Sequence, residues 1–202
     1  RWSSANHERS LHGHLNISND RFAGLTSVSY HSFDDLRMGS NGPDDYLRPY
    51  YVDLVGGRDS VVLNDDARVQ ISTAYNQLNL MQKFRYQLNQ DLSIHYGFHR
   101  SSIGTYDRYD RQLRLIDNLP QYGRWDYGPQ KWMMNHLKIR YDRSKGLFDR
   151  MKINLARQDF KESRITRNYQ SEIERTRKEE LIAYSFNADV IKRLTKKTKL
   201  YY

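Results

Sequence analysis

The sequence lacks several features on which common classes of protein depend. It has no cysteine, which excludes a disulfide framework and a thiolate metal site. It has only 4 prolines, and it contains no run of about 18 apolar residues that would form a transmembrane helix. Its mean hydropathy is −0.92, which is low for a chain that must bury an apolar core. If the chain lies in a membrane, a closed β-barrel is the only spanning structure left to it.

The composition nevertheless argues against disorder. Aromatic residues make up 13% of the chain and include 16 tyrosines, whereas disordered chains are poor in aromatic residues. A chain that is polar on average but rich in aromatic and β-branched residues is typical of strands with one apolar face.

Positive charge is distributed unevenly along the chain, whose formal net charge is +9. Residues 1–130 carry 14 basic and 15 acidic side chains, while residues 131–202 carry 19 and 9. Most of the later charges alternate with apolar residues, so they line one face of strands and do not form a basic tail. We therefore expect no nucleic-acid partner.

Alternation of apolar and polar residues with a period of two is the dominant pattern, and it predicts β-strands. In residues 92–98, for example, Leu92, Ile94 and Phe98 share one face while Ser93 and His95 share the other. Eight strands are expected, near 7–17, 22–35, 68–87, 92–104, 131–142, 148–165, 177–192 and 197–202.

The lengths of the strands and of their connections favour a membrane protein. Most of the alternating stretches exceed the 9–11 residues that a tilted strand needs to cross a bilayer. Short turns alternate with long loops, which is the pattern of outer-membrane barrels. The sequence thus predicts an all-β fold: part of a transmembrane antiparallel β-barrel, with long loops outside at 37–67, 104–130 and 166–176, and periplasmic turns at 18–21, 89–91, 142–146 and 194–197. Gly56-Gly57 predicts a hairpin within the first loop. Five residues are expected to face lipid: Leu80, Ile94, Leu137, Ile153 and Phe186.

Four segments carry a resemblance to a known family. They are LTSVSYHSFDDLRMGSN (25–41), TAYNQLNLMQKFRY (73–86), YDRYDR (106–111) and WDYGPQK (125–131). In order and spacing the chain resembles the barrel of TonB-dependent outer-membrane receptors, in particular the Bacteroidota group described as colicin I, siderophore or haemoglobin receptors. Such receptors have a barrel of about 22 strands that is closed by a plug.

The resemblance implies import of a scarce nutrient, such as a ferric siderophore or haem, across the outer membrane of a Gram-negative bacterium. The implied partners are outer-membrane lipid and a TonB-type energy-transducing complex that acts through the plug. No plug, TonB-contacting segment or signal peptide is recognisable, so we expect residues 1–202 to be a fragment of the barrel domain, about eight strands long. The haem-receptor motifs FRAP and NPNL are also absent.

Aromatic residues in the loops are the ligand-binding candidates, because flat ligands stack on rigid rings and arginines attract anionic groups. Rings that pack the loops together are the alternative interpretation. The candidate set consists of Tyr106, Arg108, Tyr109, Arg111, Arg124, Trp125 and Tyr127.

Other clusters are expected to be solvated side chains, not sites. The pairs His12/His14 and His95/His99 resemble metal ligands in spacing, and three acidic pairs (Asp34-Asp35, Asp44-Asp45, Asp65-Asp66) offer oxygens for Ca²⁺. None forms a recognised motif. We expect no metal, no cofactor and no catalytic residues, because no nucleophile, base and acid occur as a group. The alternative function is a β-rich adhesin or carbohydrate-binding surface module.

Overall fold

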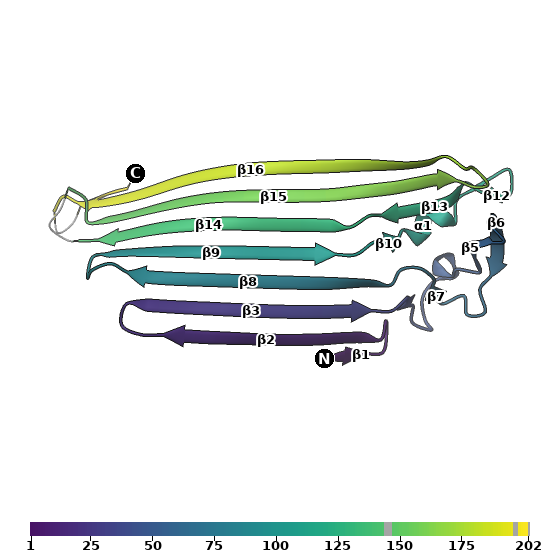
Figure 1. Cartoon of the computed structure of the whole chain (residues 1–202), viewed down its shortest axis with the longest axis horizontal. Coiled ribbons are helices and arrows are strands. Elements are labelled where there is room, and N and C mark those ends of the chain that lie inside the picture. The colour runs from purple at the N-terminus through teal and green to yellow at the C-terminus, as the bar shows by residue number, and fades with distance from the viewer. Residues whose placement is uncertain (144–146, 196–197, 202) are drawn as a thin grey trace.

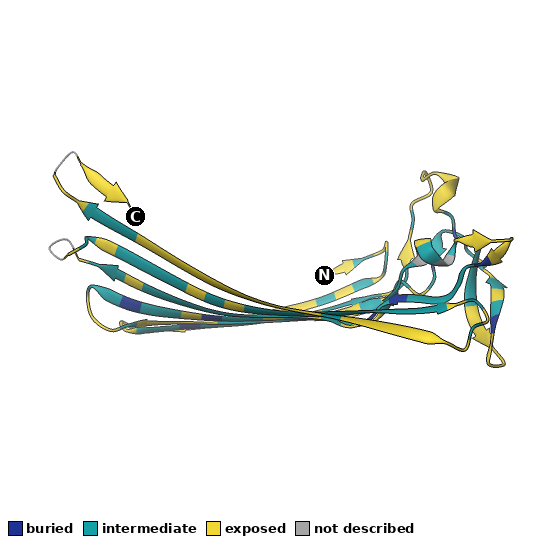
Figure 2. Ribbon diagram, turned by 90° about the horizontal axis from the view of Figure 1, so that it is seen from above, coloured by how far each residue is buried: buried dark blue, intermediate teal, exposed yellow. Residues whose placement is uncertain are grey.

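A computed structural model describes residues 1–143, 147–195 and 198–201. Its main element is one twisted antiparallel sheet (Figures 1 and 2) with the order β1-β2-β3-β8-β9-β14-β15, after which β16 pairs with β15 and β17 with β16. These strands are β1 (Trp2–Ser3), β2 (Glu8–Ser18), β3 (Phe22–Phe33), β8 (Tyr75–Gln87), β9 (Leu92–Ile103), β14 (Gln130–Asp142), β15 (Arg150–Asn168), β16 (Glu174–Arg193) and β17 (Lys199–Tyr201).

Shorter elements form the two long connections. Between β3 and β8 lie β4 (Leu36–Arg37), the 3-10 helix η1 (Asp44–Tyr46), β5 (Tyr50–Val55), β6 (Arg58–Leu63) and β7 (Val69–Gln70). Between β9 and β14 lie β10 (Tyr106–Asp107), α1 (Tyr109–Gln112), β11 (Leu115–Ile116), β12 (Leu119–Pro120) and β13 (Tyr122–Tyr127). β5 and β6 form the predicted hairpin. Gly56 and Gly57 turn it with φ of 60° and 81°, a left-handed conformation that favours glycine.

The predicted all-β, antiparallel fold is confirmed, and the predicted strands agree with the observed ones with three corrections. The strand expected to begin at 68 begins at Tyr75, because residues 69–70 pair with β4 and Ser72 has a φ of 69°. β15 and β16 are longer than expected, at 19 and 20 residues, which shortens the loop expected at 166–176. In the last strand, residues 199–201 are ordered as β17, while 196, 197 and 202 lie outside the described residues.

The register of the sheet sorts its side chains onto two faces, because residues opposite one another on neighbouring strands share a face. One row across the sheet runs through Phe84, Tyr96, Leu137, Leu155 and Phe186. We call the face that carries this row the apolar face. All five residues expected to face lipid lie on it. Leu137 and Phe186 belong to this row. Leu80, Ile94 and Ile153 each lie an even number of residues from a member of the row on the same strand, so they share its face.

The neighbouring row belongs to the opposite face, which we call the polar face. It runs through Arg85, His95, Lys138, Asn154 and Asn187. Because successive residues of a strand point to opposite faces, the alternation in the sequence becomes a chemical difference between two sides of one sheet.

The sheet is a single layer without a hydrophobic core (Figure 2). Among the described residues no hydrophobic side chain is buried, and the exposed surface is 14231 Å². A compact folded protein of 24.2 kDa exposes about 10,000 Å². On the apolar face Leu11 is 75% exposed and Phe186 is 66% exposed. The apolar face therefore has no cover within the part of the chain that the structure describes.

Connections of different length occupy opposite ends of the sheet (Figure 1). The turns after β2, β8, β14 and β16 lie at one end, and the two long connections together with the β15–β16 turn lie at the other. This agrees with the predicted grouping of connections, although 144–146 and 196–197 of the expected turns lie outside the described residues.

The sheet is open over the described residues. β2 pairs with β1 at only two positions, Trp2↔Arg9 and Ser3↔Glu8. β16 pairs with β17 at three positions, from Ile191 to Arg193. Apart from these pairings and the hydrogen bonds between Arg1 and Ser10, no described strand pairs with the outer edge of β2 or β16, so the described sheet is not itself a closed barrel. No helix within the described ranges has the length and apolar character needed to cross a membrane.

Candidate ligand-binding site

The long connections are held above the end of the sheet by the extension of β15. β14 pairs with β15 from Arg150 to Lys161, and β13 pairs with the remaining residues up to Asn168. β13 and β14 therefore follow one another along the same edge of β15. The chain passes between them at Gly128, whose amide donates to the Ser163 carbonyl at 2.7 Å. A Cβ at Gly128 would lie 1.9 Å from Ser163 Oγ and 3.1 Å from Ser163 Cβ, so any larger residue would force the Ser163 side chain to move.

Five aromatic residues form a continuous series at this end of the sheet, which we call the aromatic row: Phe33, Tyr75, Tyr106, Tyr127 and Trp125. Successive ring centroids are 4.6, 5.5, 5.6 and 5.2 Å apart. These distances are those of favourable aromatic pairs. The register places the row on the polar face, since Phe33 lies opposite Tyr75 and Tyr106 lies opposite Tyr127.

Two arginines lie against the aromatic row. The Arg108 guanidinium is 5.3 Å from the Trp125 ring centroid, and that of Arg111 is 5.9 Å from the same ring. Arg108 also donates to the Tyr127 hydroxyl at 3.2 Å and to Asp110 at 2.8 Å. Because the Arg108 and Arg111 side chains remain 35% and 33% exposed, part of each cation is open to an anionic group.

The Tyr106 hydroxyl stays neutral at ordinary pH. Burial raises the pKa of the Tyr106 hydroxyl, and the neighbouring hydroxyls of Tyr127 and Tyr75 raise it further. A neutral phenol keeps its proton and remains a hydrogen-bond donor. The row thus offers ring faces, hydroxyl donors and two guanidinium groups on one surface. That chemistry suits a flat ligand with anionic or carbonyl oxygens.

The structure separates Arg124 from the other predicted residues. Arg124 lies opposite Arg167, whereas the adjacent Trp125 lies opposite Thr166, so their side chains are on different faces. Arg124 is bound to Asp126 at 2.5 Å and to Glu174 at 2.9 Å. Five of the seven predicted residues are thus brought together. Tyr109 begins α1, but its side chain lies outside the described residues.

A buried ion pair that was not predicted from the sequence attaches the β5–β6 hairpin to β15. Both guanidinium nitrogens Nη1 and Nη2 of Arg167 donate to Asp59 at 2.6 Å, and the Gln170 amide donates to Asp59 at 2.6 Å. The Asp59 side chain is 1% exposed. A Cβ at Gly123 would lie 2.2 Å from Asp59 Oδ2, so only glycine leaves room for the carboxylate.

The hydrogen bonds of Asp59 decide its protonation. Burial acts to raise its pKa, but the bonds from Arg167 and Gln170, together with the charge of Arg167, outweigh burial and hold the pKa below its ordinary value. The partners are 108 residues apart in the chain. Nothing in the local sequence links the two positions.

The connection between β3 and β8 is also packed internally. Arg48 is fully buried and donates to the Ile71 carbonyl. The Asn64 side-chain amide donates to the carbonyls of Arg48 and Val69, each at 2.8 Å. The aromatic row is therefore bordered by an ordered loop with buried polar anchors.

The histidine and aspartate pairs noted in the sequence do not form a metal site among the described residues. The His12 and His14 rings are 5.6 Å apart, and His12 Nδ1 is 2.7 Å from Ser29 Oγ. Asp66 is paired with Arg37 at 2.6 Å. Within the described ranges, no three His, Asp or Glu side chains come together as a metal site would require.

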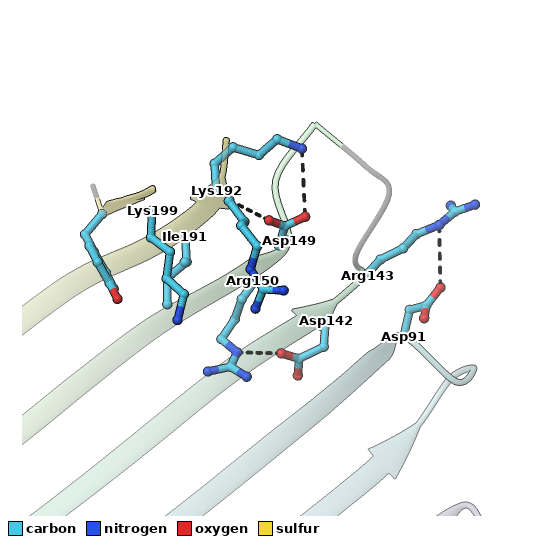
Figure 3. A pocket seen from close by; sticks show the side chains of 10 residues that line it. Asp91, Asp142, Arg143, Asp149, Arg150, Ile191, Lys192 and Lys199 are labelled. Atoms are coloured by element: carbon cyan, nitrogen blue, oxygen red, sulfur yellow. Dashed lines mark hydrogen bonds and ion pairs between the residues drawn. The ribbon is translucent and has the colours of Figure 1, made fainter. Parts of the chain in front are cut away.

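A hollow of about 940 Å³ lies at the opposite end of the sheet (Figure 3). Its carboxylates are each paired with a cation. Asp142 is 2.7 Å from Arg150, Asp149 is 3.8 Å from Lys192, and Asp91 is 3.8 Å from Arg143. These ion pairs connect residues at neighbouring short turns, although the lining contains five cations and only three carboxylates.

Comparison with known proteins adds no family to these observations. No family model, curated protein or solved structure matches this chain. The candidate site therefore rests on its own geometry: an aromatic row with two partly exposed arginines, on the polar face, beneath two long connections.

Proposed function

We propose that this chain is part of the wall of an outer-membrane β-barrel, in a TonB-dependent receptor that imports a scarce nutrient such as a ferric siderophore or haem. One observation carries the proposal. The sheet has an extended apolar face, and none of the described hydrophobic residues is buried. A lipid bilayer is the cover that suits such a face on a single-layer sheet.

The dimensions of the strands support this assignment. β2, β3, β8, β9 and β14 contain 11, 12, 13, 12 and 13 residues, respectively. A tilted strand needs about 9–11 residues to cross a bilayer. On β16 the apolar face carries Ile182, Tyr184, Phe186, Ala188 and Val190, and charged residues begin above it at Glu180. On the neighbouring strands the charged border begins lower, because Arg157 shares a row with Tyr184, and Asp159 and Arg100 share the row of Ile182. The rows of Phe186, Ala188 and Val190 form an uncharged belt that fits a hydrocarbon layer.

The polar face supports a wide barrel. It carries arginine, lysine and histidine side chains that are too long and too charged for the lumen of an eight-stranded barrel. In a barrel of about 22 strands they would line a wet or plugged interior. Unpaired strand edges are not tolerated in lipid, so further strands would complete the wall. A TonB-type complex acting on a plug would supply the energy for transport.

In this proposal the aromatic row receives the ligand. The row lies on the lumen side, at the end where the long connections gather, which would be the extracellular end. Trp125 and Tyr127 offer ring faces for stacking, while Arg108 and Arg111 offer charge for anionic oxygens.

Uptake of a ferric siderophore tests the proposed function. In a host whose iron supply depends on this protein, Trp125→Ala and Tyr127→Ala should reduce ferric siderophore uptake several-fold at equal surface abundance. Tyr46→Ala is the matched control, because Tyr46 is a loop aromatic that is 55% exposed and outside the row. Equal uptake by all three variants would show that the ligand is bound elsewhere.

Detergent dependence separates the receptor from a surface module. A barrel wall requires detergent or lipid to remain dispersed, whereas an adhesin or carbohydrate-binding module does not. Solubility without detergent, together with glycan binding by the aromatic row, would replace the receptor proposal with the module.

A further inference from the structure

Cationic residues gather in one part of the polar face, near the short turns. Four neighbouring rows contain six Lys and Arg residues on three strands, β8, β14 and β15. We call this group the basic patch: Lys83, Arg85, Lys138, Arg140, Arg150 and Lys152, with His95 at its centre. The register places Arg85 opposite His95, and His95 opposite Lys138. Arg140 lies opposite Lys152.

Carboxylates balance only part of this charge. Asp142 is paired with Arg140 and Arg150, and Asp189 is 3.9 Å from Lys152. Across the described residues, no carboxylate lies within ion-pair distance of Lys83 or Lys138. Like charges on neighbouring strands repel one another. The basic patch therefore carries an uncompensated positive charge that a bound anion would stabilise.

The charge is local to this region. The next two rows of the polar face, through His99 and Met134 and through Ser101 and Trp132, contain no Lys, Arg, Asp or Glu. Beyond them Arg164 lies between two acids, 3.5 Å from Glu162 and 3.6 Å from Glu179. Within the described part of the sheet, two rows without charged residues therefore separate the positive charge near the short turns from the charges at the other end.

A hollow lies directly on the basic patch. It measures about 600 Å³, and its charged and titratable lining residues are His95, Lys138, Arg140, Arg150, Lys152 and one acid, Asp189. This volume lies within the range of small-molecule sites. Arginine forks match phosphate and carboxylate oxygens, and lysine adds a point charge.

We propose that this hollow binds a small polyanion that bears several phosphate or carboxylate groups. The site is distinct from the aromatic row, which lies at the other end of the sheet. It does not depend on the receptor function proposed above, because binding requires only the polar face and no transport.

Calorimetric titration tests this proposal, with inorganic triphosphate and citrate as the two probes; the sample is the protein extracted in detergent from its host membrane, not residues 1–202 refolded alone. Binding of at least one probe is expected, with an affinity that falls as salt rises. The probe that binds identifies the phosphate or the carboxylate class. If neither probe binds at low ionic strength, the proposal is overturned, while the receptor proposal is unaffected.

Paired variants assign the binding to the basic patch. Lys138→Gln with Lys152→Gln should weaken binding about tenfold or more, because two lysines that line the hollow lose their charge-assisted contacts. Lys138→Arg with Lys152→Arg should retain it, which separates loss of charge from loss of fold. The matched control is Lys131→Gln with Lys178→Gln, two lysines on the opposite face. Equal loss in the control pair would mean that the anions bind by net charge alone, and would overturn the site.

Discussion

Phe186 and Asn187 are adjacent on β16, yet they meet different surroundings because their side chains lie on opposite faces of the sheet. Phe186 shares a row with Leu155 and Leu137, and Asn187 shares one with Asn154 and Lys138. If the apolar face is in contact with lipid, a charge is costly at the first position and mild at the second.

Arginine substitution at these two positions measures the difference. Phe186→Arg should reduce the free energy of unfolding by roughly 2–4 kcal/mol, as expected for a charge near the bilayer midplane. Asn187→Arg, one residue away, should change it little. Urea unfolding of the protein in lipid vesicles provides the measurement. Similar losses for both variants would argue against a membrane on the apolar face.

Asp59 determines whether the β5–β6 hairpin stays attached. Asp59→Asn leaves the buried Arg167 without its charged partner and should cost about 3–5 kcal/mol. Amide hydrogen exchange in residues 50–63 should become faster. Asp53→Asn, an exposed position on the same hairpin, is the control. Unchanged exchange in both variants would mean that other contacts hold the hairpin.

The same ion pair predicts a response to acid. The pKa of Asp59 is lowered in the folded protein, so the stabilisation is fully present above its ordinary value of 3.8 and is lost as pH falls through the lower folded value. Exchange in residues 50–63, corrected for the intrinsic rate, should therefore rise only in strong acid. A rise near neutral pH would point to a histidine instead.

At the scale of elements, alternation predicted the long strands because a period of two is a local property of the sequence. β2, β3, β9 and β14 agree with the expected ranges to within two residues at each end. The pairing of β13 with β15 was missed because residues 104–130 were interpreted as loop. Had 122–127 been assigned to a strand, alternation alone would have separated Arg124 from Trp125.

Contacts between segments that are distant in the chain could not be predicted from the sequence. Tyr106, Trp125 and Tyr127 were predicted as candidates, but Phe33 and Tyr75 join them only because β3, β8 and β10 end side by side. Asp59 lies on β6 and Arg167 on β15, 108 residues later, so their pairing depends on tertiary structure. The candidate site was thus predicted in its residue types, and its arrangement required the fold.

The orientation of the connections is tested by surface labelling. The chain has no cysteine, so single substitutions report without background. Asn41→Cys lies in the connection between β3 and β8, and Asp20→Cys lies in the β2–β3 turn; both positions are exposed. An impermeant maleimide on intact cells should label position 41 and leave position 20 unlabelled. The reverse result would invert the orientation.

For the molecule as a whole, the open edges of β2 and β16 determine behaviour in isolation. Unpaired strand edges are templates for pairing with other chains. Residues 1–202, produced alone and refolded in detergent, should therefore form mixed oligomers and remain sensitive to protease. A monodisperse, heat-stable monomer would mean that these strands close a small barrel by themselves.

The cover of the apolar face is the central claim, and nitroxide accessibility along β16 tests it most directly. Single cysteines from Tyr184 to Asp189, spin-labelled in the protein reconstituted in lipid vesicles, are probed with oxygen and with a water-soluble nickel complex. Oxygen accessibility should peak at Tyr184, Phe186 and Ala188 and fall at the residues between them. Peak accessibility to the nickel complex at Phe186, or accessibility without a period of two, would contradict a lipid-covered sheet.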